Sequence, residues 1–177
     1  MGHVLPVTPN HSYTSYMSQA QRLIGGILCL DFINTTGDSE PGDAALSDAV
    51  VARTQRFRAA LRRILEAEAR GTGAASADLA SLNRILSASG AKRGLIPTVR
   101  GYGWGWLGDG AGPERLLWPV AFSAARLLES PDLVRLKSCD GCGRLFLDAS
   151  HNRSRRWCDM QGCGNRAKVA RYRARKD

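Results

Sequence analysis

Four of the five cysteines lie close together near the C-terminus, in a spacing that suits a metal ion. Cys139 and Cys142 are two residues apart, fifteen residues follow, and then Cys158 and Cys163 are four residues apart. Thiolates two to four residues apart can hold one side of a tetrahedral zinc ion, and two such pairs complete the site. A disulfide framework fits a cytosolic chain poorly, and a redox Cys-x-x-Cys needs no second pair. The spacing predicts one structural zinc ion bound by all four cysteines.

The elements expected around these cysteines form a small finger. Asp140 to Gly143 is typical of a tight turn, 144–148 is predicted as a strand, and 154–157 as its return partner. A helix is expected over 164–176, which has many helix formers and no proline. Turn, hairpin and then a helix beginning at the last cysteine is the treble-clef order. Metal binding can contribute about 10–16 kcal/mol, so the finger is expected to unfold without it.

Positive charge is concentrated in the same segment. Residues 137–177 hold 11 Lys/Arg against 4 Asp, a net +7, whereas the first 136 residues hold 14 against 12 acidic residues, a net +2. Cations that displace counterions from phosphates indicate a polyanionic partner, although a solvated basic tail is the alternative. The candidate nucleic-acid contacts are Arg153, Arg155 and Arg156 on the hairpin, and Arg166, Lys168, Arg171, Arg173, Arg175 and Lys176 on the helix.

The part of the chain before the finger reads as a mostly helical α+β domain with a small sheet. Residues 1–20 are polar and are expected to be a flexible lead-in, followed by a domain over 21–132 and the finger over 133–177. The apolar run 23–35 is predicted as a buried strand. Asp31 and Asn34 fall at its end, where they are candidate ligand contacts, with turn formation and capping as the alternative.

Three helices and one more strand are expected next. The 3.6-residue period predicts a helix over about 44–70, and Ser76 is predicted to cap a second helix that ends before Gly90. Tyr102, Trp104 and Trp106 alternate with glycines, which predicts a strand whose aromatic face packs against a helix. A third helix is expected over 113–130.

Motifs in both parts of the chain resemble those of two known families. Cys163-Gly164-Asn165-Arg166, preceded by the segment 154–158, resembles the CGNR zinc finger. The segment 26–35 is similar to the opening of the ABATE domain, as are Leu61-Arg62 and Leu82-Asn83. The resemblance implies a bacterial transcription regulator, described as stress-induced, whose finger binds DNA. His151 departs from the Arg or Lys expected there, which puts one phosphate contact in doubt.

Several functions are consistent with these observations. The leading hypothesis is a regulator that binds double-stranded DNA through the basic helix, with an N-terminal domain that senses a small molecule. Asn165 and Arg166 can equally cap that helix and brace the cysteine turn. The alternative is a zinc-stabilised module that binds protein or RNA. A nuclease using His151 and Asn152 is disfavoured, because the helix lacks a second metal-binding His.

The remaining expectations concern class and location. No catalytic triad or carboxylate pair is recognisable, so an enzyme is not expected. The longest apolar run is far shorter than the ~20 residues of a membrane span, and no signal peptide is recognisable, so a soluble cytoplasmic protein is expected. Regulators of this size often form homodimers, although no dimer seam is recognisable.

Overall fold

The computed structural model describes residues 25–35, 47–99, 101–108 and 113–176. The expected lead-in over 1–20 and the start of the first long helix at 44–46 lie outside these residues. The chain forms two compact units, which are described separately. Residues 92–108 belong to the smaller unit, and the helices and the cysteine-containing segment belong to the larger one.

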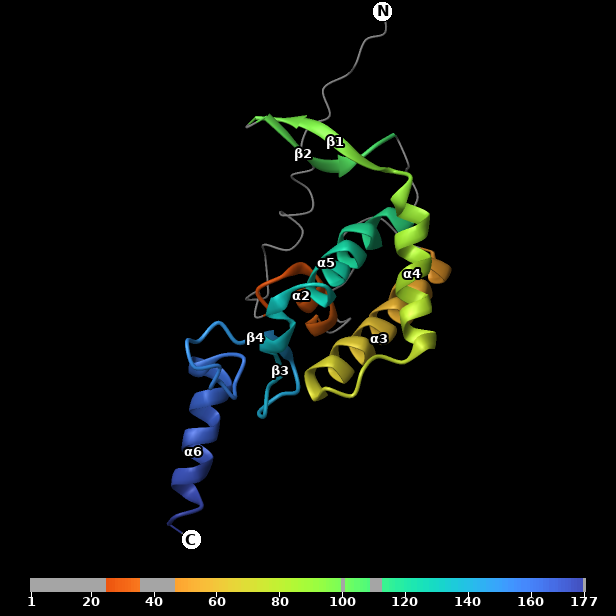
Figure 1. Cartoon of the computed structure of the whole chain (residues 1–177). Coiled ribbons are helices and arrows are strands. Elements are labelled where there is room, and N and C mark those ends of the chain that lie inside the picture. The colour runs from red at the N-terminus through yellow and green to blue at the C-terminus, as the bar shows by residue number, and fades with distance from the viewer. Residues whose placement is uncertain (1–24, 36–46, 100, 109–112, 177) are drawn as a thin grey trace, which may run out of the picture. The chain divides into compact units, whose positions relative to one another are not determined.

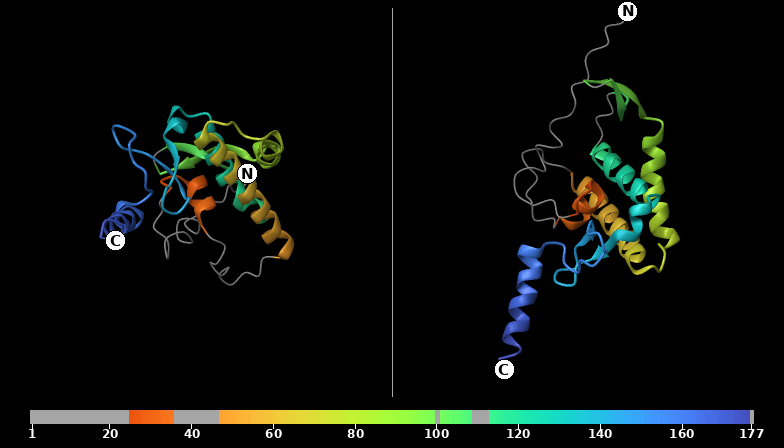
Figure 2. Two further views of the ribbon diagram at one scale, coloured as in Figure 1. Left: turned by 90° about the horizontal axis from the view of Figure 1, so that it is seen from below. Right: turned by 60° about the vertical axis from the view of Figure 1, so that its left-hand side comes forward.

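Four helices make up most of the larger unit before the finger region. They are α2 (Leu28–Asn34), α3 (Asp48–Arg70), α4 (Ser76–Gly90) and α5 (Trp118–Leu128). Short 3-10 turns, Pro113–Leu117 and Pro131–Arg135, lie on either side of α5. Helix α4 packs against both α3 and α5, and α2 packs against α3 and α5 (Figures 1 and 2). Within the described part of the chain, no helix combines the length and the apolar character needed to cross a membrane.

One apolar core holds these helices together. The 3.6-residue period of α3 places Phe57, Leu61, Ile64 and Leu65 on its buried side, as the sequence predicts. Two alanines of α5, Ala121 and Ala124, are fully buried and allow close packing of the neighbouring helices. The other core residues are Cys29, Leu30, Ile33, Leu82, Leu117, Val120, Leu127, Leu136 and Leu145.

Helix α2 occupies the segment predicted as a buried strand, so that prediction is wrong. A short apolar run can be a strand or a helix when it is buried on several sides, because no polar face remains to mark the period. Gly26 enters the helix with a φ of +79°, which favours glycine. A Cβ on Gly25 would lie 2.4 Å from the Leu30 Cβ, so the chain turns tightly here. The pair Gly25-Gly26 is visible in the sequence, but nothing in the sequence indicates that it begins a helix.

The helix boundaries differ in detail from expectation. Ala75, not Ser76, precedes α4, and no side chain caps its N-terminus. Gly90 is the last helical residue of α4 instead of the first residue beyond it. Asp78 in the first turn of α4 instead binds Arg63 of α3, with a closest N–O distance of 2.6 Å. A contact to the neighbouring helix therefore takes the place of the expected cap.

The smaller unit, as far as it is described, is an antiparallel hairpin of β1 (Arg93–Thr98) and β2 (Gly101–Trp106). The register pairs Leu95 with Trp104 and Pro97 with Tyr102, so these side chains share one face. Tyr102 is 79% exposed and Trp104 is 66% exposed. Packing of these two rings against a helix stays a prediction.

The finger region contains a second two-stranded sheet and the last helix. Strands β3 (Leu136–Ser138) and β4 (Leu145–Leu147) are antiparallel and are joined by the turn that carries Cys139 and Cys142. The expected return strand over 154–157 is therefore wrong, because β4 pairs with the strand before the turn. A π-helical turn, Met160–Gly164, leads into α6 (Asn165–Arg173). The described part of the chain is of the α+β class, as predicted.

Candidate metal centre and nucleic-acid interface

The four predicted cysteine ligands come together at one point. All four sulfurs lie within 4.8 Å of one another. The Sγ atoms of Cys142 and Cys158 are 3.6 Å apart, and those of Cys158 and Cys163 are 4.0 Å apart. Tetrahedral zinc with Zn–S bonds of about 2.3 Å requires sulfurs about 3.8 Å apart. The cluster is therefore positioned to bind a metal ion, with Cys142 as its exposed member.

The first pair of cysteines is held by a tight backbone turn between β3 and β4. The Cys139 N–H donates to Arg144 O at 2.9 Å, and the Gly143 N–H donates to Cys139 O at 2.9 Å. Gly143 has a φ of +69°, in the left-handed region that favours glycine. Burial alone would raise the pKa of Cys139, but N–H groups of Cys158, Gly141 and Cys142 outweigh it and lower the pKa to about 7. Several peptide N–H groups, each the positive end of a dipole, thus point at the Cys139 sulfur.

The second pair is positioned by the side chain of Asp159. Its carboxylate accepts hydrogen bonds from the N–H groups of Gln161 and Gly162, both at 3.1 Å, and so begins the turn that carries Cys163. Burial, and then the neighbouring sulfurs, raise the pKa of Cys158. A divalent cation that replaces the protons would relieve this repulsion between thiolates. The sequence analysis missed Asp159, although an Asp shortly before a glycine is a recognisable turn signal.

Arg166 touches the metal cluster directly. Its Nη2 lies 3.0 Å from the Cys163 sulfur, one helical turn before it. A cation at this distance donates a charge-assisted hydrogen bond to a thiolate and offsets part of its negative charge. This contact supports the alternative in which Arg166 braces the cysteine turn. The role of Arg166 as a nucleic-acid contact stays a prediction.

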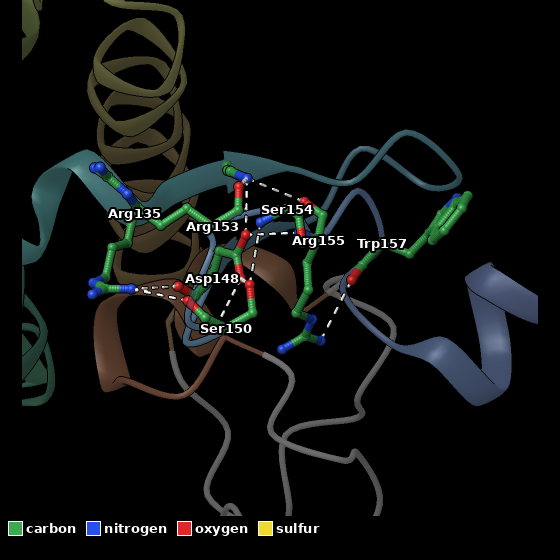
Figure 3. A network of polar contacts seen from close by, with 8 residues as sticks. Arg135, Asp148, Ser150, Arg153, Ser154, Arg155 and Trp157 are labelled. Atoms are coloured by element: carbon green, nitrogen blue, oxygen red, sulfur yellow. Dashed lines mark hydrogen bonds and ion pairs between the residues drawn. The ribbon is translucent and has the colours of Figure 1, made fainter.

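Asp148 is the centre of the loop between β4 and Cys158. Its side chain is 0% exposed. It accepts hydrogen bonds from Lys137 Nζ at 2.8 Å, from the Arg155 N–H at 2.8 Å, and from both the N–H and the hydroxyl of Ser150 (Figure 3). Burial alone would raise the pKa of Asp148, but the hydrogen bond from Lys137, followed by those from Ser150 and Arg155, holds it well below its ordinary value. The carboxylate is thus a buried anion that organises the loop.

Two of the three predicted hairpin cations are engaged within the protein. The Arg155 guanidinium donates to Cys158 O at 2.7 Å and lies over the Phe146 ring at 5.3 Å, so it braces the approach to the second cysteine pair. Arg156 forms an exposed ion pair with Asp140 at 2.7 Å. Arg153 is exposed, and its backbone φ of +48° lies in the left-handed region. Sequence reasoning placed all three on one basic edge without distinguishing these roles.

The cations predicted for the last helix lie in α6, except for Arg175 and Lys176, which lie in the turn after it. The side chains of Arg166, Lys168, Arg171, Arg173, Arg175 and Lys176 are all exposed. No residue of α6 is buried. Between residues 160 and 176 there is no acidic residue. The helix therefore presents positive charge that no acidic side chain of its own segment neutralises.

The two candidate ligand residues of the N-terminal region have protein partners. The Asp31 carboxylate accepts a hydrogen bond from the Gly25 N–H at 2.9 Å, and burial raises its pKa. The Asn34 amide donates to Leu145 O at 2.7 Å and accepts from the Leu145 N–H at 3.1 Å. The hydrogen bond between Asp31 and Gly25 forms a turn, and the two hydrogen bonds between Asn34 and Leu145 connect α2 to β4. Ligand binding by either residue stays a prediction.

Comparisons with known families agree with this geometry. The CGNR zinc finger model matches residues 135–176, the segment that holds the four cysteines and α6. The ABATE model, described as “Putative stress-induced transcription regulator”, matches residues 26–131. These are regulator and zinc-finger families. No curated protein gives a significant match. The two matches follow the order expected from the motifs, and the chain belongs to the ABATE family, with a CGNR zinc finger over residues 135–176.

Proposed function

We propose that this protein regulates transcription by binding double-stranded DNA through helix α6, which a single structural zinc ion holds in place. The observation that carries the proposal is the charge of α6 and of the turn that follows it. Six exposed cations lie between residues 166 and 176, with no acidic residue among them. Because no residue of α6 is buried, its cations gain nothing from packing on the rest of the protein, and another partner accounts for this charge better.

Zinc is the metal that this ligand set favours. Four thiolates in a tetrahedral arrangement are typical of structural zinc sites, because zinc is a borderline-soft ion with no preferred geometry of its own. Cys139, Cys142, Cys158 and Cys163 would hold the ion. Its charge would neutralise sulfurs that otherwise repel one another, and so fix the turn from which α6 begins.

The dimensions of α6 suit the DNA major groove. An α-helix with its side chains is about 10–12 Å across, and the groove is about 12 Å wide. Arg171 lies in α6, and Arg175 lies in the turn that follows it, four residues further along the chain. Arginine can contact phosphates, and it can also read guanine with two hydrogen bonds.

The test is a titration of labelled genomic duplex fragments with the zinc-loaded protein at two salt concentrations. Each phosphate contact contributes about 0.9 to the slope of log affinity against log salt. Replacing both Arg171 and Arg175 by Ala should weaken binding and lower that slope by about 1.8 if both contact phosphates. Fluorescence anisotropy of the labelled DNA measures both quantities.

The matched control replaces Arg56 and Arg84 by Ala. Both are exposed arginines of α3 and α4, so this variant loses the same charge outside the finger. It should bind like the unmodified protein. If the two double variants weaken binding equally, net charge and not α6 attracts the DNA, and the proposal fails.

An alternative is a zinc-stabilised module that binds RNA or another protein without specific DNA recognition. It predicts intact zinc binding with no salt-sensitive affinity for duplex DNA in the same titration. Sensing of a small molecule by the N-terminal helices and assembly into a homodimer stay predictions.

A further inference from the structure

The β1–β2 hairpin carries a second surface that the proposed function does not use. Leu95, Tyr102 and Trp104 are 61%, 79% and 66% exposed and share one face of the hairpin. Arg93 lies over the Trp104 ring, with its Cζ 5.1 Å from the ring centre. Two large aromatic rings exposed side by side cost hydration free energy, so they call for an explanation.

The opposite face of the hairpin carries aliphatic side chains and glycines. A Cβ on Gly105 would lie 2.3 Å from the Ile96 Cδ1, and a Cβ on Gly94 would lie 2.6 Å from the Leu107 Cδ1. The aliphatic side chains of Ile96 and Leu107 therefore lie across these glycines. The alternation of glycine with aromatic residues leaves one face covered by aliphatic side chains and the other bearing the rings.

The charge of the hairpin indicates an anionic partner. Residues 92–108 include three cations, Lys92, Arg93 and Arg100, and no acidic residue. Exposed aromatic rings in a cationic setting are the combination with which proteins bind single-stranded nucleic acids, since every base has a face that can stack.

The spacing of the rings suits a base. Tyr102 and Trp104 are two residues apart on one strand, a separation of about 6.6–6.8 Å, and side chains stand roughly perpendicular to a sheet. Stacked bases are about 3.4 Å apart. One base between the two rings would need about twice this distance, which is what the strand provides.

We propose that the aromatic face of the β1–β2 hairpin binds single-stranded nucleic acid by stacking unpaired bases on Tyr102 and Trp104, with Lys92 and Arg93 contacting the phosphates. This site shares no residue with α6, so the proposal can be tested independently of DNA binding by the finger.

The test compares two labelled strands of equal length. One is a 12-nucleotide oligothymidine, and the other is an abasic 12-mer that keeps the phosphates and lacks the bases. Electrostatic binding, including any by α6, is common to both strands, so the ratio of their affinities isolates stacking. The unmodified full-length protein should favour oligothymidine. The Trp104→Ala variant should reduce this preference by roughly 5- to 100-fold, the effect expected for one base–aromatic stack.

Three further variants make the result specific. Trp104→Phe keeps an aromatic ring and should retain most of the preference. Arg171→Ala with Arg175→Ala should weaken both strands and leave their ratio unchanged. Leu116→Ala removes an apolar side chain of similar exposure in the larger unit and should change nothing.

Two outcomes would overturn the proposal. One is an equal affinity of the unmodified protein for both strands, and the other is an unchanged preference in Trp104→Ala. Binding to phosphatidylserine vesicles that is lost in Trp104→Ala, with no preference between the two strands, would instead assign the hairpin to a lipid surface.

Discussion

Arg166 is the residue at which the metal cluster and the basic helix meet. Its guanidinium lies 3.0 Å from the Cys163 sulfur, while the residue itself is exposed on α6. Four thiolates around one zinc ion leave a net negative charge, so a cation beside one sulfur lowers the energy of the complex. A single side chain can thus stabilise the site and still contribute to the charge of the helix.

Replacing Arg166 by Ala should lower zinc affinity by about 10- to 100-fold, the usual effect of losing a partner of a metal ligand. Competition with a chromophoric chelator measures this affinity. Lys168→Ala removes a cation of the same helix that has no contact with a sulfur and is the control. Equal zinc affinities in the two variants would show that the Arg166 contact is unimportant for the metal.

Asp148 should make the stability of the finger region depend on pH. Its pKa is depressed in the folded protein, so its contribution is complete above the unfolded value of about 3.9 and is lost as the pH falls through the folded value. We therefore expect the difference in free energy of unfolding between the unmodified protein and Asp148→Asn to be constant above about pH 5 and to shrink below about pH 4.

Urea denaturation of both proteins across this pH range measures the difference. Asp132→Asn, which removes an exposed carboxylate paired with Arg135, controls for general effects of acid. The same pH dependence in Asp132→Asn and Asp148→Asn would contradict the assignment to the buried carboxylate.

At the scale of elements, the sequence predicts helices that have a clear apolar period and metal ligands that have a characteristic spacing. The long helix α3 follows from its apolar stripe, and the four cysteines follow from the spacing that a tetrahedral ion imposes. Helix α2 was wrongly predicted as a strand. Its conformation depends on its contacts with neighbouring elements, and its own run of apolar residues does not distinguish a helix from a strand. Residues 154–157 were predicted as a strand, but they belong to a loop that the buried carboxylate of Asp148 organises. Such an arrangement leaves no period in the sequence by which it could be predicted.

The same argument applies to the side chains of the site. Asp159 and Arg155 act through contacts to backbone atoms near the cysteines, and their residue types alone do not distinguish them from surface charges. Arg166 was found by its motif, whereas its contact to the Cys163 sulfur became evident only in the structure.

Asn34 should be a major link between α2 and β4. Replacing it by Ala leaves the buried N–H and C=O of Leu145 without this partner, which should cost about 2–3 kcal/mol of stability. Asn83→Ala, at an exposed position on α4, is the matched control and should change stability by no more than about 0.5 kcal/mol. Urea unfolding with zinc present measures both, and equal values for the two variants would contradict this role.

At the scale of the whole molecule, charge and metal are concentrated in one segment. Residues 137–177 carry a net +7, whereas the larger remainder carries +2. Mutual repulsion among these cations opposes folding of the segment, and its own buried apolar cluster is small, consisting of Phe146 and the cysteines with Trp157 beside them. We therefore expect metal coordination to be the main source of stability for the finger.

Removing the metal should unfold the finger and leave most helical structure intact. Structural zinc can contribute about 10–16 kcal/mol, whereas α3, α4 and α5 are held by their own core. Hydrogen exchange measured after chelation should show loss of protection at the Gly143 and Gly164 amides and retained protection within α3. Protection that persists at both glycines would show that the finger folds without metal.

The bond between Asn34 and Leu145 also has a consequence for how such a protein can be inherited. Leu136 and Leu145 lie in the same core as the helices, and an asparagine from α2 completes the hydrogen bonding of β4. A recombination event that moved residues 135–176 behind an unrelated protein would leave those backbone groups unpaired and two leucines facing water. Selection would therefore act on the finger and on residues 25–35 as a single heritable unit, although about a hundred residues separate them along the chain.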